Sequence, residues 1–99
     1  MNEMTQAQIR ALNHLPIHMR EGATRYLLDG IEPGGFQRAV LENNLHDALG
    51  KADHENRDAI FFWACWLNVL PMAAWGSRER IDRWIAEGGL RGLTKGEAA

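Results

Sequence analysis

Apolar residues are most concentrated between Ala59 and Trp75, where only Asn68 and Pro71 interrupt them. Three of the four tryptophans of the chain lie in this stretch. Because proline lacks an amide hydrogen and disfavours helical geometry in the residue before it, we expect a helix over residues 53–69 that ends before Pro71. A membrane span needs about 20 apolar residues, so the stretch is too short to cross a bilayer. It therefore predicts one long, tryptophan-rich central helix, buried by its own chain alone or partly by a second copy.

On a helical wheel this segment has two apolar stripes and one mixed strip. The apolar stripes comprise Ile60, Trp63, Ala64 and Leu67, and Ala59, Phe62, Trp66 and Val69. The mixed strip starts with polar residues, which indicates that it faces water; it comprises His54, Arg57, Asp58, Phe61, Cys65 and Asn68. Its apolar members then lie where a loop, a chain terminus or a partner would cover them. The candidate partner-binding residues are therefore Phe61, Cys65, Asn68 and Arg57.

Shorter segments with apolar residues three and four positions apart predict further helices. Thr5 and Gln8 have the spacing of a capping box, which predicts a helix through residue 12 with Ile9 and Leu12 facing inward. Other helices are expected at residues 16–29, 36–42, 45–49 and 78–87. Their expected inward-facing residues are Met19, Ala23, Tyr26 and Leu27; Phe36, Ala39 and Val40; Leu45, Ala48 and Leu49; and Ile81, Trp84 and Ile85.

The helix ends have recognisable residues. Gly30 is placed to end the second helix in a left-handed conformation, with Ile31 folding back on the last turn. Asp53 and Ser77 are expected to cap the helices that follow them. Gly50 is expected to close the helix before it.

These patterns predict an all-α fold. Neither strict alternation of polar and apolar residues nor a β-branched run occurs, so no strand is expected. The expected architecture is a compact array of five or six short helices around the long central helix. Ninety-nine residues suit one domain, here residues 5–87. Residues 1–4 are expected to form a flexible tail, and residues 88–99, which are glycine-broken and lack periodicity, a mobile C-terminal tail.

Charge does not point to nucleic acid. The formal net charge is −2, and acidic and basic residues are interleaved along the chain. The densest basic segment, residues 78–83, alternates with acids and lacks the basic stripe of a nucleic-acid binder. The amino terminus lacks the pattern of a signal peptide, and a single cysteine, Cys65, excludes an internal disulfide. A cytoplasmic protein that binds neither nucleic acid nor membrane is expected.

Catalytic and metal-binding patterns are weak. His14 and His18 have the four-residue spacing of a shared helix face, but Pro16 lies between them. Zinc sites need three or four convergent ligands, so no metal is expected, and no cofactor motif occurs. Ser77 is explained as a helix cap, and Cys65 lacks a basic neighbour that would activate it. We therefore expect a protein that is not an enzyme.

One loop offers an alternative site. Residues 32–35 read Glu-Pro-Gly-Gly and precede a predicted helix, whose free amides could hold an anion. The loop lacks the spacing of a dinucleotide or phosphate-binding motif. Gly34, Gly35 and Tyr26 are the candidate residues of a small-ligand site there.

Short motifs from Leu15 to Ile85 match a recurring pattern. They are Leu15-Pro-Ile-His-Met19, Arg25-Tyr26, Gly30-Ile31, Pro33-Gly-Gly-Phe36, Ala39-Val-Leu41, Asn43-Asn-Leu45, Ala52-Asp53, Asn56, Trp75-Gly-Ser77 and Trp84-Ile85. This pattern resembles a family of small, mostly uncharacterised proteins of phages and prophages. Where the family has serine, leucine, aspartate and cysteine, this chain has Gly35, Gln37, Asn44 and Ala74.

The resemblance implies a phage-borne accessory protein that acts in the host cytoplasm. By analogy with that class of genes, it would be a non-enzymatic protein that binds a host protein or complex. Inhibitors of host defence, including anti-CRISPR proteins, belong to this class. Two alternatives remain open: a homodimer formed through the strip of Phe61, Cys65 and Asn68, and a small-ligand binder at the Gly34-Gly35 loop.

Overall fold

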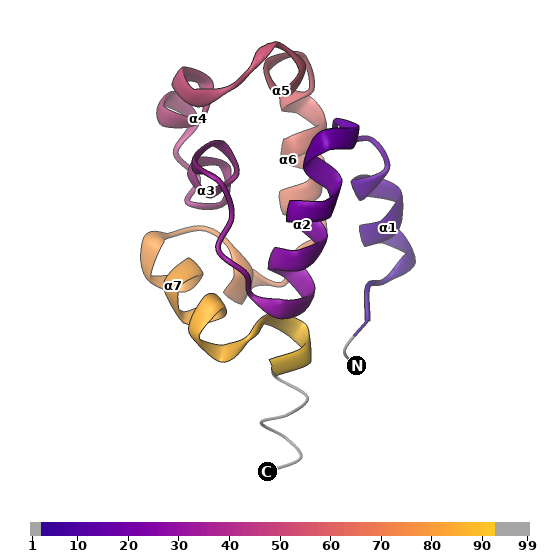
Figure 1. Ribbon diagram of the computed structural model, residues 1–99, viewed down its shortest axis with the longest axis vertical. Coiled ribbons are helices and arrows are strands. Elements are labelled where there is room, and N and C mark those ends of the chain that lie inside the picture. Colours follow the sequence, from indigo (N-terminus) through magenta and orange to yellow (C-terminus); the bar gives the residue numbers. More distant parts are fainter. Residues whose placement is uncertain (1–2, 93–99) are drawn as a thin grey trace.

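The computed structural model describes residues 3–92, which form seven α-helices, one 3-10 helix and no strand. The all-α prediction is therefore confirmed. In chain order the elements are α1 (Gln6–Leu12), α2 (Ile17–Asp29), α3 (Gly35–Leu41), α4 (Leu45–Lys51), α5 (His54–Asp58), α6 (Ile60–Val69), the 3-10 helix η1 (Met72–Ala74) and α7 (Arg78–Glu87) (Figure 1). No helix in this part of the chain is long and apolar enough to span a membrane.

The long central helix predicted over residues 53–69 is wrong. The segment forms two helices, α5 and α6, which meet at Ala59, where φ is −99° and ψ is 14°. The segment contains neither proline nor glycine, so no local signal marks the break. A hydrogen bond of 3.1 Å from the Trp63 indole Nε1 to the buried Asn56 Oδ1 links the two helices across it. The fold therefore has more and shorter helices than the five or six expected around one long helix.

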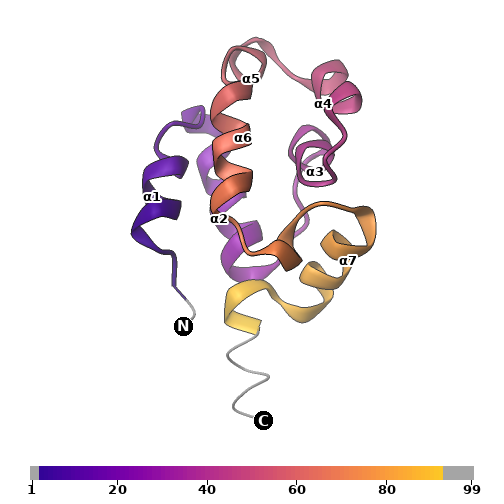
Figure 2. The same ribbon diagram turned by 180° about the vertical axis from the view of Figure 1, so that it is seen from behind.

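The helix α6 nevertheless lies at the centre of the fold. In Figure 2 it lies in front of α2, between α1 on one side and α3 and α4 on the other, while α7 closes the lower end. The tryptophans Trp63 and Trp66 point into the core and are almost completely buried. Other fully buried large side chains come from the α1–α2 connection, α2, α3 and α7: Leu15, Tyr26, Leu27, Gln37, Leu41 and Ile81.

Local capping signals were read correctly. The capping box of Thr5 and Gln8 forms at the start of α1. The Asp53 carboxylate accepts from the Asn56 amide at 2.8 Å, and the Ser77 hydroxyl accepts from the Arg80 amide at 3.2 Å. These side chains satisfy amides that a helix N-terminus leaves free.

Several inward-facing assignments in the short helices are wrong. Leu45, Leu49 and Ile9 are exposed, although the periodicity placed them in the core. Ala48 alone is buried in α4, and Gly50 lies within that helix instead of closing it. In α1 the buried residues are Gln8 and Ala11, and the Gln8 side-chain amide donates to the Val69 carbonyl at 2.9 Å. A seven-residue helix touches its neighbours over a narrow strip, so periodicity alone does not fix which strip.

The chain after α7 folds back onto α2. Residues 89–92 form a further helical turn, and Arg91 pairs with Asp29 at 3.0 Å, although residues 88–99 were expected to be a mobile tail. Residues 93–99 of that predicted tail, and residues 1–2 of the other, lie outside the described residues. Gly30 ends α2 in the left-handed conformation, as expected, and the Ile31 amide bonds back to the Arg25 carbonyl at 3.4 Å, but the Ile31 side chain is half-exposed.

Two glycines make this return possible. Gly30 and Gly89 both have positive φ, 66° and 69°. A Cβ on Gly89 would lie 2.6 Å from the Gly30 nitrogen, and a Cβ on Gly30 would lie 2.8 Å from the Trp84 carbonyl oxygen. Only glycine fits where the two backbones approach so closely. A hydrogen bond of 2.9 Å from the Trp84 indole to the Tyr26 carbonyl joins the same two segments.

Replacing Gly89 with alanine should therefore unfold the protein at a lower temperature. We expect Gly89→Ala to lose at least about 2 kcal/mol of unfolding free energy, because backbone strain and the clash with Gly30 act together. For a domain of this size, each kcal/mol lowers the melting temperature by about 4–8 °C. Gly50→Ala is the matched control, since nothing lies within 4 Å of its added methyl group. Equal melting temperatures for the two variants, measured by circular dichroism, would contradict the close approach.

Candidate functional site

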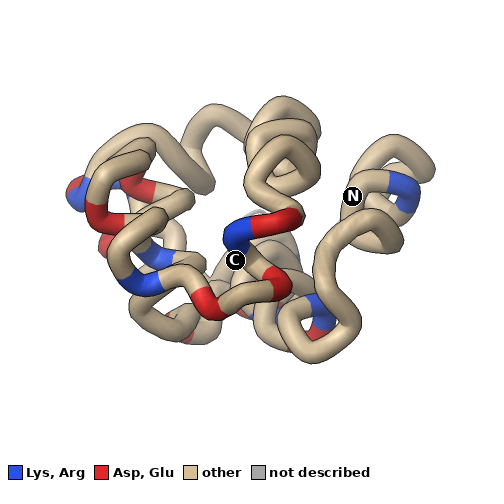
Figure 3. The backbone as a smooth tube through the Cα atoms, turned by 90° about the horizontal axis from the view of Figure 1, so that it is seen from above, with Lys and Arg blue, Asp and Glu red and all other residues tan. Residues whose placement is uncertain are grey.

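One side of α6 is exposed and uncharged. Its residues Phe61, Ala64, Cys65 and Asn68 lie opposite the buried tryptophans, because positions three and four apart share a helix side; we call this set the α6 face. Phe61 is 69% exposed, and Cys65 is half-buried. Figure 2 shows no other described helix in front of α6. Elsewhere in the described chain, acidic and basic residues are interleaved (Figure 3).

An apolar groove borders the α6 face. It lies between α6 and the helices α3 and α4, has a volume of about 170 Å³, and includes the two asparagines of the α3–α4 turn. Leu45 stands at this groove with 63% of its surface exposed, and Ala64 belongs to both the groove and the α6 face. We call it the α4–α6 groove; it is lined by Val40, Asn43, Asn44, Leu45, Ala48, Ile60, Trp63, Ala64 and Leu67. Face and groove form one continuous surface.

Phe62, the neighbour of Phe61 in the sequence, is less exposed than Phe61 and packs within the fold. Its ring stacks on His14, with ring centres 5.0 Å apart and planes inclined by 11°. Phe61 contacts Phe62 edge to face, at 5.6 Å and 74°, and extends beyond it into solvent. The fold therefore covers much of one aromatic ring and leaves the other open.

The structure brings together three of the four predicted partner-binding residues. Phe61, Cys65 and Asn68 lie on the α6 face, as the wheel indicated. Arg57 is exposed but belongs to α5, on the other side of the break at Ala59. The sequence did not reveal the groove, because its far wall comes from α3 and α4 and Leu45 was expected in the core.

The predicted small-ligand residues do not meet at one surface. Gly34 and Gly35 are exposed at the start of α3. Tyr26 is fully buried, and its hydroxyl donates to the Ala74 carbonyl at 2.6 Å. Burial raises the pKa of Tyr26 above its ordinary value, so the hydroxyl stays protonated. Tyr26 therefore stabilises the core and offers no contact to a ligand at the loop.

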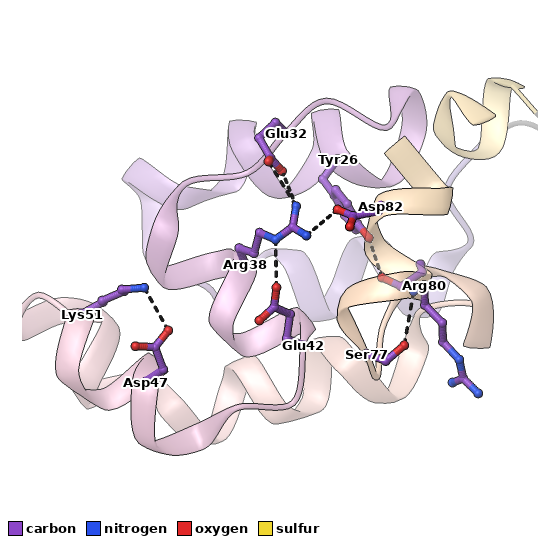
Figure 4. Close-up of polar contacts among 10 residues, drawn as sticks. Tyr26, Glu32, Arg38, Glu42, Asp47, Lys51, Ser77, Arg80 and Asp82 are labelled. Atoms are coloured by element: carbon purple, nitrogen blue, oxygen red, sulfur yellow. Dashed lines mark hydrogen bonds and ion pairs between the residues drawn. The ribbon is translucent and has the colours of Figure 1, made fainter. Parts of the chain in front are cut away.

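An ion cluster lies beside that loop (Figure 4). The guanidinium of Arg38 contacts Glu32 at 3.0 Å, Glu42 at 2.9 Å and Asp82. The hydrogen bond to Asp82 is the main cause that raises the pKa of Arg38 further above its ordinary value. The cluster ties α3 to the preceding loop and to α7, so its role is structural.

The histidines do not converge. His14 stacks on Phe62, whereas His18 contacts Asp53 at 2.9 Å and Glu55 at 3.6 Å. Within residues 3–92, no group of three or more potential metal ligands lies close enough together to hold an ion. The structure gives these side chains contacts within the fold.

Comparison of the chain with protein-family models, with curated proteins and with solved structures gives no significant match. The function must therefore be inferred from the geometry of the site. That geometry is an open aromatic residue beside an apolar groove on an uncharged helix.

Removing the central cation of the ion cluster should destabilise the protein. Arg38→Met leaves three carboxylates facing one another, and we expect a loss of about 1–2 kcal/mol after allowing for solvent screening of the exposed acids. Arg25→Met is the control, because Arg25 forms an exposed pair with Glu21 within one helix. Such pairs contribute about 0.5 kcal/mol or less. Urea unfolding compares the two, and a larger loss in Arg25→Met would contradict the assignment.

Proposed function

We propose that this protein is a non-enzymatic interaction protein that binds another protein through the α6 face and the α4–α6 groove. The observation that carries the proposal is the 69% exposure of Phe61 beside an apolar groove of about 170 Å³. Burying a phenylalanine side chain contributes about 1.5–3 kcal/mol, and here that contribution is left for a partner.

The surface has the composition of a protein-contact centre. Such centres combine an aromatic anchor with a well-formed pocket and few charges. Phe61 supplies the anchor, and the groove supplies the pocket. Between Ala59 and Gly76 no residue is charged, so a partner need not pair or desolvate a charge along α6 itself.

Three polar residues outside the α6 face, which could be suspected of a catalytic or ligand-binding role, have structural roles instead. The Ser77 hydroxyl caps α7, the Tyr26 hydroxyl bonds the Ala74 carbonyl, and Arg38 holds the ion cluster. These roles favour binding over catalysis as the activity of the protein.

The biological partner is proposed from the motif resemblance. Small phage accessory proteins act on proteins of the host, and inhibitors of host defence, including anti-CRISPR proteins, are one class among them. We therefore propose a host protein or complex in the cytoplasm as the partner. The α6 face supplies the contact whichever host protein is bound.

Capture from a host lysate tests this function when matched variants are compared. Immobilised wild-type protein and the control Met72→Glu should retain the same host protein. Met72 is 75% exposed in η1, beside α7 rather than on the α6 face. Phe61→Glu should reduce retention at least tenfold, as expected for loss of an interface anchor.

Both substitutions are at exposed positions, so each should change the unfolding free energy by less than about 0.5 kcal/mol. Equal retention by the two variants would place the contact elsewhere. Repeated capture of no protein by the wild type would also count against the proposal.

A further inference from the structure

We draw no further inference here: the strongest candidate, the exposed α6 face with the α4–α6 groove beside it, belongs to the site already described, and nothing in the described part of the chain shows which further occupant covers it.

Discussion

The burial of Trp63 and Trp66 on one side of α6 is the interaction on which the rest of the structure depends. Both indoles are almost completely buried, and Trp63 also bonds Asn56 across the α5–α6 junction. Once helix geometry commits these positions to the core, it commits Phe61 and Asn68 to the opposite side. The exposed face is therefore a direct consequence of how the core is filled.

The same logic explains which predictions held. Caps depend on a few adjacent residues, so Thr5, Asp53 and Ser77 could be assigned from the sequence. That Phe61 lies on the side of α6 away from the core could be predicted too, because α6 is long enough for its periodicity to define a buried side; that no loop covers Phe61 could not. The short helix α4 lacks that length, and Leu45 was assigned to the core although it stands open beside the groove.

Features that depend on contacts between distant segments of the chain could not be predicted from the local sequence. The α5–α6 break falls at an alanine, which usually continues a helix. The fit of Gly30 against Gly89 joins positions far apart in the chain, and each glycine alone indicates only a helix end. Tyr26 was a candidate residue of the site at the glycine loop, whereas its hydroxyl donates to the Ala74 carbonyl in the core. In each case a contact between segments far apart in the sequence determines the local structure, and the local sequence pattern alone does not.

Hydroxyl-radical footprinting of dilute, monomeric protein tests the central claim most directly, because it compares side chains of α6 in a single experiment. Tryptophan is intrinsically at least as reactive as phenylalanine, so protection of a tryptophan reports burial. The account predicts rapid modification of Phe61 and strong protection of Trp63 and Trp66. Modification of either tryptophan at a rate equal to that of Phe61 would contradict it, because α6 would then have no buried side.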